Sequence, residues 1–224
     1  MFYDIPVQQS QWKGRAVLDI KGVSYKSVFF DFDGVVADTN SLKHRNIHAS
    51  VSGHLGPLSA AEFVSFFTAN NGIPREHKIY SWFDSRTGQA ILQEYARRNR
   101  ESFTRVGTTP GFARFFQRCC DAGARTWVLS GGDAGEIEAI LRRNKLDRFD
   151  GILAGPASKS ENLERLAYQK PAVFFGDSRH DYEVALEFGL GFIFMSGYTQ
   201  FREWPVYFKN KPIIGIISSF TELL

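Results

Sequence analysis

The sequence predicts an α/β fold, with a parallel β-sheet covered by helices on both faces. Two observations carry this prediction. Short apolar, β-rich segments alternate with helical segments along most of the chain. Two acidic residues directly follow the first strong apolar segment, and strand ends over a buried sheet are where α/β proteins place their chemistry. The predicted strands are residues 27–32, 126–130, 151–153, 172–176, 191–195 and 213–217.

The composition is that of a globular protein, with 43% hydrophobic and 23% charged residues. A chain of 224 residues can bury one substantial core, or one core and a small appendage. The net charge of +3 is too small to indicate a nucleic-acid surface, so no nucleic-acid partner is expected. No apolar run reaches the roughly 18 residues of a membrane span, so no membrane partner is expected.

The two cysteines indicate the redox conditions of the compartment in which the protein is expected to reside. Cys119 and Cys120 are adjacent, and neighbours in a helix point about 100° apart and do not form an ordinary disulfide. They are interpreted as reduced thiols. The first residues lack the basic segment and long apolar stretch of a signal peptide, so a cytoplasmic location is expected.

Residues 1–25 form an N-terminal extension to which the sequence assigns no role. Within it, Ala16 to Ile20 is interpreted as an added edge strand, followed by a turn at Lys21 and Gly22.

Residues 40–108 interrupt the alternation and are predicted to be wholly helical. Residues 59–62 (Ser-Ala-Ala-Glu) predict a capping box that begins one helix, which the Asn-Asn-Gly of residues 70–72 ends. Further helices are predicted over residues 74–83 and 88–103. The aromatic residues at helical spacing are interpreted as the core of this insertion rather than as a ligand platform.

Two later helices have clear start signals. Residues 109–111 (Thr-Pro-Gly) place proline in a first helical turn, and Gly123 is placed to end that helix. Asp133 and Glu136 predict a capping box for the next helix.

Asp31 and Asp33 stand one residue apart at the end of the first sheet strand and are followed at once by Gly34. In an extended chain both carboxylates point to the same side. Like charges so close oppose ionisation, so the pair needs a cation, a shared proton or both. A plain Asp-Gly turn after a strand is the structural alternative.

Residues 31–39 (Asp-Phe-Asp-Gly-Val-Val-Ala-Asp-Thr) resemble the first motif of the haloacid dehalogenase-like (HAD) superfamily, in its phosphatase and phosphomutase branch. Three segments resemble its later motifs in order: residues 128–132 (Val-Leu-Ser-Gly-Gly), Lys159 at a helix start, and residues 174–181 (Phe-Phe-Gly-Asp-Ser-Arg-His-Asp). Each later motif is weak alone, but the ordered set is specific. The resemblance covers roughly residues 26–224.

The resemblance implies a doubly wound, Rossmann-like core of residues 26–39 and 109–224, with residues 40–108 as a small helical cap. It implies a Mg²⁺-dependent phosphatase that hydrolyses a small phosphorylated metabolite, a sugar phosphate or nucleotide, through an aspartyl phosphate. A sugar phosphomutase sharing this step is the alternative. A non-catalytic binding module is a third hypothesis, against which the complete motif set argues. A monomer or homodimer is expected.

The resemblance also implies roles for the acids. Asp31 is the nucleophile, and Asp33 is the general acid and base. Asp31, the main-chain carbonyl of Asp33, and Asp177 match the family's metal ligands. Asp181 would support the site through a metal-bound water or through Lys159. An acid at the position of Asp33 favours phosphate esters over the halide or phosphonate chemistry of other branches.

Ser130, Gly131 and Lys159 are the predicted phosphate-binding residues, since amide and hydroxyl groups and a point charge suit phosphate. Arg75, after the turn that resembles the cap's specificity loop, is the candidate for a second phosphate or a sugar hydroxyl of the substrate. A surface arginine at a helix start is the alternative. Mutases of this family often carry a histidine twelve residues after the nucleophile, where this chain has Lys43, and this weighs against mutase activity.

Overall fold

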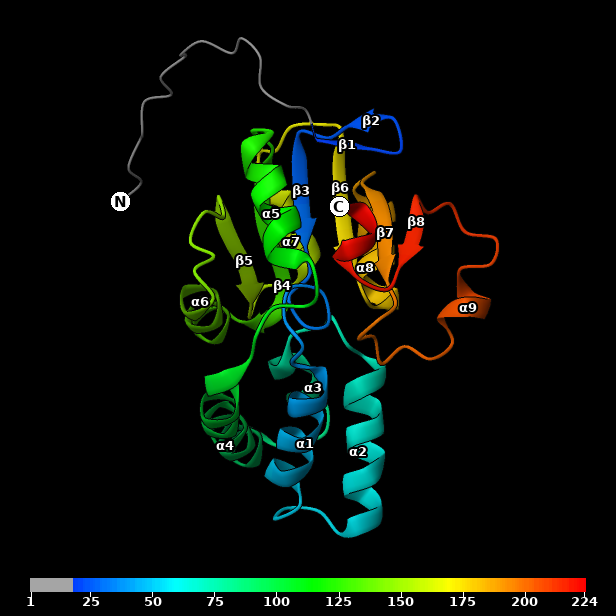
Figure 1. Cartoon of the computed structure of the whole chain (residues 1–224). Coiled ribbons are helices and arrows are strands. Elements are labelled where there is room, and N and C mark those ends of the chain that lie inside the picture. Colours follow the sequence, from blue (N-terminus) through cyan, green and yellow to red (C-terminus); the bar gives the residue numbers. More distant parts are fainter. Residues whose placement is uncertain (1–17) are drawn as a thin grey trace.

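The computed structural model describes residues 18–224, and its centre is a six-stranded sheet in which all neighbouring strands run parallel (Figure 1). The order is β5-β4-β3-β6-β7-β8, so the first strand of this sheet lies inside it and the chain winds outward in both directions. The strands are β3 (Ser27–Phe30), β4 (Arg125–Asp133), β5 (Gly151–Gly155), β6 (Ala172–Gly176), β7 (Gly191–Met195) and β8 (Gly215–Ile217).

Helices cover both faces of the sheet, which confirms the predicted doubly wound, Rossmann-like fold. Alternate residues of β3 point to opposite faces: Phe30 joins the apolar cluster that contains α5 and α6, whereas Phe29 joins the cluster that contains α7 and α8. Phe30 stacks on Phe175 of the neighbouring strand β6, with ring centres 5.3 Å apart. The core helices are α5 (Phe112–Asp121), α6 (Ala134–Arg143), α7 (Lys159–Glu164), α8 (Arg179–Glu187), α9 (Trp204–Tyr207) and η2 (Phe220–Leu223).

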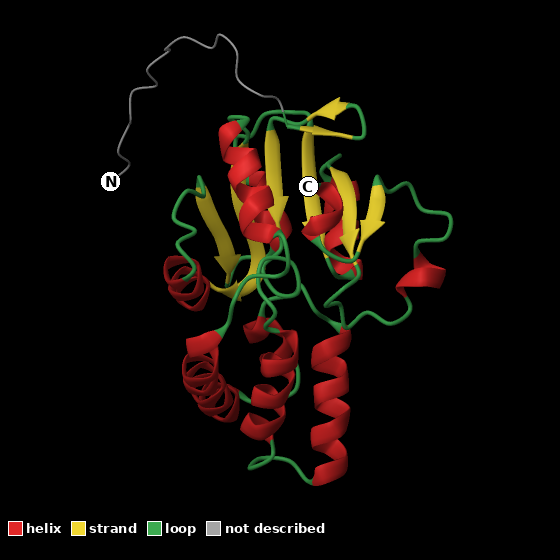
Figure 2. Cartoon of the chain, viewed as in Figure 1, coloured by secondary structure: helices red, strands yellow, loops and turns green. Residues whose placement is uncertain are grey.

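Four helices of the insertion pack together beyond the carboxyl ends of the strands (Figures 1 and 2). They enclose an apolar cluster of their own, with Ile47, Phe63, Ile79, Ile91 and Tyr95 at its centre. This burial explains the aromatic stripe seen in the sequence. The helices are α1 (Asn40–Val51), α2 (Pro57–Ala69), α3 (Arg75–Tyr80) and α4 (Ser85–Ser102), followed by η1 (Phe103–Arg105).

Two local predictions were wrong. The predicted capping box at residues 59–62 does not begin a helix, because α2 already starts at Pro57, whose fixed φ suits a first helical position. The predicted added edge strand does not join the sheet: β1 (Asp19–Ile20) pairs antiparallel with β2 (Val23–Ser24) in a separate hairpin. Ala16 and Val17 of that prediction, with the rest of residues 1–17, lie outside the described residues.

Other predictions were confirmed in whole or in part. Strands β6 and β7 have the predicted bounds, and Cys119 and Cys120 are both free thiols. The Asp133 side chain caps α6 by accepting from the Glu136 N–H, but Glu136 does not return the bond of a capping box. Within residues 18–224, no helix combines the length and apolarity needed to cross a membrane.

Candidate active site

Asp31 lies just beyond the carboxyl end of β3, and its side chain is almost completely buried. Its N–H donates to the Phe175 carbonyl of β6 at 2.9 Å, which fixes the start of the following loop. Gly34 turns this loop at a φ of +77°, and a side chain there would collide with Asp177 and Asn40. The glycine after the two acids therefore allows both the turn and the close approach of Asp177.

Lys159 joins two acids at the base of the site. It is the first residue of α7, and its side chain is fully buried. Its Nζ donates to Asp31 Oδ1 at 2.9 Å and also to Asp181 Oδ1. Burial opposes the charge, but Asp181 and Asp31 outweigh it and raise the pKa of Lys159 above its ordinary value. Lys159 is therefore a permanent cation beside Asp31.

Asp181 has partners at both of its carboxylate oxygens. Lys159 occupies Oδ1, while Oδ2 accepts from the Ser178 hydroxyl at 2.7 Å and from the N–H groups of Ser178 and Asp177 at 3.0 and 3.2 Å. The Asp181 N–H donates back to Ser178 Oγ at 3.2 Å, and together with the bond from the Ser178 N–H this forms the capping box that begins α8. With both oxygens engaged, Asp181 is suited to holding Lys159 and the loop rather than to reacting.

The acids fit a divalent cation. Carboxylate oxygens of Asp31, Asp177 and Asp181 lie within 4.8 Å of one another. Burial, reinforced by neighbouring carboxylates, raises the pKa of Asp31 to about 7 and that of Asp177 well above its ordinary value. Asp177 has only a neutral amide as a side-chain partner among the described residues, Asn40 Nδ2 at 2.9 Å. Such a cluster of hard oxygen donors with excess negative charge suits Mg²⁺.

Ser130 lies where β4 departs from regular pairing, since its register against β5 shifts between Leu129 and Asp133. Its Oγ accepts from the Gly132 N–H at 3.0 Å, so its hydroxyl proton can be donated to a ligand. Ser130 and Gly131 line the same cavity as Asp31. This irregular segment offers a hydroxyl and amides at the strand end, as phosphate binding requires.

Asp33 has different surroundings from Asp31. Its Oδ2 pairs with Lys43 Nζ at 2.5 Å, and its Oδ1 accepts from the Thr39 hydroxyl. Burial opposes ionisation of Asp33, but Lys43 and Thr39 outweigh it and lower the pKa of this carboxyl. Burial likewise opposes the ammonium charge, but Asp33 raises the pKa of Lys43 to about 12. Asp33 is therefore ionised at neutral pH.

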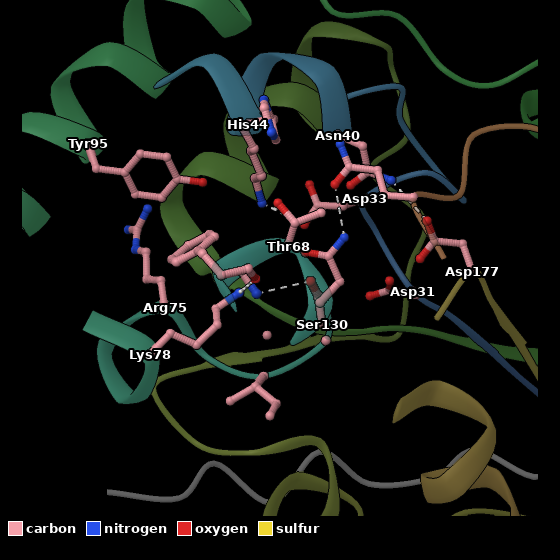
Figure 3. Close-up of a pocket in the computed structure, with 18 residues that line it drawn as sticks. Asp31, Asp33, Asn40, His44, Thr68, Arg75, Lys78, Tyr95, Ser130 and Asp177 are labelled. Atoms are coloured by element: carbon pink, nitrogen blue, oxygen red, sulfur yellow. Dashed lines mark hydrogen bonds and ion pairs between the residues drawn. The ribbon is translucent and has the colours of Figure 1, made fainter. Parts of the chain in front are cut away.

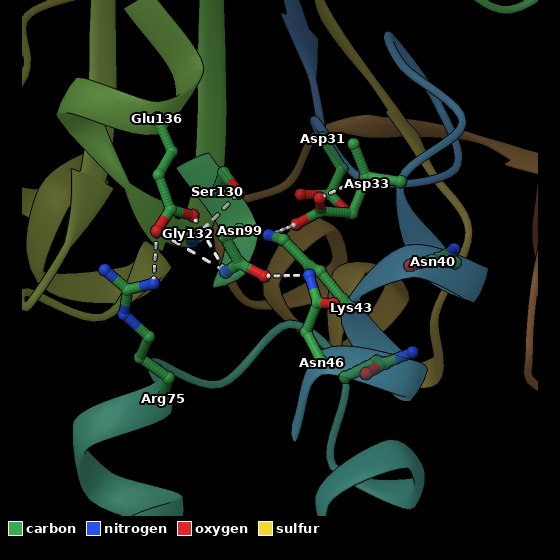
Figure 4. Close-up of polar contacts among 12 residues, drawn as sticks. Asp31, Asp33, Asn40, Lys43, Asn46, Arg75, Asn99, Ser130, Gly132 and Glu136 are labelled. Carbon is green, nitrogen blue, oxygen red and sulfur yellow. Dashed lines mark hydrogen bonds and ion pairs between the residues drawn. The ribbon is translucent and has the colours of Figure 1, made fainter. Parts of the chain in front are cut away.

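Arg75 connects the cap to the core (Figure 4). Its guanidinium pairs with Glu136 at 2.7 Å and with Asp133 at 3.0 Å, both at the start of α6. Asn99 of α4 donates to the same Glu136 carboxylate at 3.2 Å and accepts from Asn46 of α1 at 2.8 Å. The cap helices α3 and α4 are thus both bonded to residues at the start of α6 in the core.

The cavity between cap and core has a volume of about 50 Å³, several times the roughly 10–15 Å³ that one water needs (Figure 3). Asp31, Asp33 and Ser130 line it from the core, and Lys78 and Tyr95 from the cap. A wider cleft of about 970 Å³ adjoins it. The two hollows share six lining residues, which are His44, Thr68, Asn71, Ile73, Asp177 and Gln200. Of the acids of the site, Asp177 lines both hollows, so the wider cleft meets the cavity at this carboxylate.

A sequence model of the haloacid dehalogenase-like hydrolases matches residues 25–189, which include all four motifs. The chain belongs to this family. No curated protein sequence matches it. The family match makes this HAD-type protein a hydrolase, as the motifs predicted.

Solved structures with the same fold share little sequence with this HAD-like hydrolase. A protein from Bacteroides fragilis, described as a haloacid dehalogenase-like hydrolase, is 22% identical with a TM-score of 0.72, over 90% of this chain and 100% of that one. A predicted phosphatase from Clostridium acetobutylicum is 22% identical with a TM-score of 0.70, over 89% and 96%. CbbY from Rhodobacter sphaeroides, solved with xylulose-(1,5)bisphosphate, is 19% identical with a TM-score of 0.67, over 89% and 96%.

The structure brings the predicted site residues together. Asp31, Asp33, Arg75, Asp177, Ser130 and Gly131 line one cavity of this HAD-like hydrolase, and Lys159 and Asp181 bond to its acids.

Sequence reasoning missed Asn40 and Lys78 as site residues, and noted Lys43 only as a replaced histidine. Lys43 had one signal, its place in the first turn of the helix that follows the acidic loop. A lone lysine such as Lys78 in the middle of a charged helix carries no such signal.

Proposed function

We propose that this protein is a Mg²⁺-dependent phosphatase that hydrolyses a small phosphorylated metabolite through an aspartyl phosphate on Asp31. The observation that carries the proposal is the contrast between the two acids. Asp31 shares a buried lysine with Asp181, whereas Asp33 has its own cation, Lys43. Two neighbouring carboxylates with different surroundings suit the separate roles of nucleophile and proton carrier.

In the first step the Asp31 carboxylate attacks phosphorus and the P–O bond to the alcohol breaks. The protonated form of Asp33, which the ion pair with Lys43 makes the minor form at neutral pH, passes its proton to the leaving oxygen, and the phosphoryl group stays on Asp31. The Ser130 hydroxyl and the amides beside it would bind the phosphoryl oxygens, and Lys159 would offset their charge.

In the second step Asp33 receives a proton from water, and the oxygen of that water attacks phosphorus. This releases inorganic phosphate and restores the Asp31 carboxylate. The ion pair with Lys43 favours the ionised form of Asp33, which is the form that accepts this proton. The wider cleft beside the cavity would admit the water and the substrate.

Asp31, the Asp33 carbonyl and Asp177 would hold the metal. Bound Mg²⁺ neutralises phosphate charge that otherwise repels a carboxylate nucleophile. The raised pKa values of Asp31 and Asp177 support the proposal, because a further cation between these two buried acids would favour their ionised forms.

A sugar phosphomutase would share the first step and differ in returning the phosphoryl group to a sugar. We favour hydrolysis, because Lys43 stands where mutases of the family often have a histidine, and because its pairing with Asp33 favours the ionised form of Asp33, which activates water.

Sugar phosphates and nucleotides are the proposed substrates, and the protein is proposed to be a cytoplasmic monomer or homodimer. One similar structure is that of a predicted phosphoglycolate phosphatase from Haemophilus somnus, and CbbY was solved with a sugar bisphosphate.

Phosphate release from p-nitrophenyl phosphate and a panel of phosphorylated metabolites, with EDTA and then with Mg²⁺, tests the function. We expect EDTA to abolish release and Mg²⁺ to restore it. Full activity of the metal-free protein would contradict the proposal, and transfer of phosphate to a second sugar position without release would indicate the mutase.

A further inference from the structure

Lys78 is a buried cation in the cavity wall that has no acidic partner. It lies on α3 of the cap, is 5% exposed, and its side chain extends toward Ser130 (Figure 3). Among residues 18–224, no carboxylate forms an ion pair with Lys78, and its one hydrogen-bond acceptor is the Phe67 carbonyl, 3.3 Å from Nζ. Nζ also lies 3.7 Å from the centre of the Phe67 ring.

The other two cations that line the cavity are paired. Lys43 binds Asp33, and Arg75 binds Glu136 and Asp133. A buried ammonium without an anion is costly, because it has lost water and gained no opposite charge. Burial and the nearby charge of Lys43 lower the pKa of Lys78 to about 7. An anion bound in the cavity would supply the missing opposite charge and would favour the ammonium form of Lys78.

We infer that Lys78 binds a second anionic group of the substrate, which is therefore a small phosphate monoester that also carries a carboxylate or another phosphate. The inference rests on the proposed phosphatase function and names its substrate class. In the proposed function Lys159 and Ser130, both in the core, serve the phosphoryl group, whereas Lys78 lines the cavity from the cap.

The carboxylates of Glu136 and Asp133 make Arg75 the poorer candidate for this anion, since binding it would break a buried pair. The volume of about 50 Å³ favours a short spacer between the two anions. A long leaving group would have to extend into the adjoining cleft, where Lys78 is not among the lining residues.

Matched substrates test the inference. 2-Phosphoglycolate and 2-hydroxyethyl phosphate differ by a carboxylate, and 1,3-propanediol bisphosphate and 3-hydroxypropyl phosphate differ by a phosphate, so the two pairs distinguish the sources of the anion. We expect kcat/KM of the wild type to favour the anionic member of at least one pair by roughly 10- to 100-fold, the range of a charge-assisted hydrogen bond.

Lys78→Met should remove this preference, Lys78→Arg should retain part of it, and Lys209→Met, an exposed control, should leave it intact. Unchanged selectivity in Lys78→Met would overturn the inference, as would equal losses on both members of each pair, which would place Lys78 at the phosphoryl group. Absence of any wild-type preference would also overturn it.

A binding measurement separates this inference from the proposed function, because it needs no turnover. Calorimetry with Mg²⁺ compares 3-phosphonopropionate and propane-1,3-bisphosphonate with propylphosphonate, which lacks a second anion. The wild type should bind at least one of the ligands with two anionic groups roughly 10-fold or more tightly than propylphosphonate, and Lys78→Met should not. Equal affinities in the wild type would reject the role of Lys78 even in an active phosphatase. A Lys78-dependent preference in a protein that hydrolyses nothing would reject the phosphatase function alone.

Discussion

The ammonium of Lys43 lies 2.5 Å from the carboxylate of Asp33, and this pair sets Asp33 apart from Asp31 only two residues away. Burial alone would raise the pKa of both acids. It does so for Asp31, whose pKa rises to about 7, but Lys43 and Thr39 reverse the effect at Asp33. Lys43, on the cap's first helix, thus makes the largest contribution to keeping this proposed catalytic group ionised.

Replacing Lys43 with methionine should move the acidic limb of the kcat profile to higher pH. Asp33 has a lowered pKa, so its base form is present above that pKa and is lost as the pH falls through it. Without Lys43 the burial effect remains and the pKa rises, by roughly 1–3 units for the loss of a close opposite charge. The pH dependence of kcat with p-nitrophenyl phosphate measures the shift.

His44 provides the matched control for Lys43. It is the next residue of α1 and lines the same cavity, but it forms no bond with Asp33 in residues 18–224. His44→Gln should leave the acidic limb in place. If both variants, or neither, shift the limb, Lys43 does not set the proton affinity of Asp33.

Asparagine substitutions should separate the two acids. Asp31→Asn removes the nucleophile and should abolish turnover, because an amide oxygen does not form the phosphoenzyme. Asp33→Asn keeps the nucleophile and should slow turnover by roughly 10²-fold or more, the usual contribution of a general acid or base. Rapid quench with labelled substrate measures the phosphoenzyme directly. Near-normal turnover of Asp31→Asn would exclude the covalent route.

Lys159→Met should lose both activity and stability while remaining folded. The substitution leaves the buried carboxylates of Asp31 and Asp181 without their cation, which costs about 3–5 kcal/mol for a broken buried pair. Circular dichroism, urea unfolding and kinetics distinguish the two losses. Lys145→Met, which removes an exposed lysine, is the control. Normal kinetics of Lys159→Met would mean that the third motif has no role in catalysis.

Arg75 and Glu136 should behave as one unit. Arg75→Gln and Glu136→Gln each break the 2.7 Å pair that joins cap to core, so the double variant should lose little more than either single one. A coupling of about 1–3 kcal/mol in unfolding free energy, or in kcat/KM, would report this pairing. Additive losses would mean that Arg75 acts elsewhere, for example on the substrate as the sequence predicted.

The sequence predicted those elements whose signals are local. Strand β6 is a buried apolar run that ends at turn-forming residues, and it was predicted to the residue. The start of α2 was not, because the serine signal at residue 59 competed with Pro57, which lies two residues earlier. Of the β1–β2 hairpin, the sequence predicted a strand ending at Ile20 and the turn at Lys21 and Gly22, but not β2, because a strand of two residues carries too little pattern.

The order of the four motifs was enough to name every residue that bonds with Asp31 through a side chain in the described part of the chain. The sequence could not predict side-chain pairs that form only through tertiary packing. Arg75 and Glu136 are 61 residues apart and meet only when cap and core close. The isolation of Lys78 is a property of its surroundings, which no local pattern encodes.

Mg²⁺ should stabilise the protein by an amount that grows with pH. In the metal-free protein burial raises the pKa of Asp31 and Asp177 above their unfolded values, so the folded state loses stability as the pH rises from about 4 toward about 7. A bound divalent cation relieves this penalty, so the difference in Tm with and without Mg²⁺ should increase across that window. At a hundredfold excess of Mg²⁺ over Kd the gain in stability at neutral pH is about 2.7 kcal/mol, or roughly 5–10 °C in Tm for a chain of this size.

Differential scanning calorimetry at several pH values, with Ca²⁺ and Na⁺ as comparison cations, measures the difference in Tm. Asp177→Asn should abolish most of it, while Asp121→Asn, on the exposed end of α5, should not. If Mg²⁺ raises Tm by the same amount at pH 5 and pH 8, the cation binds away from these acids.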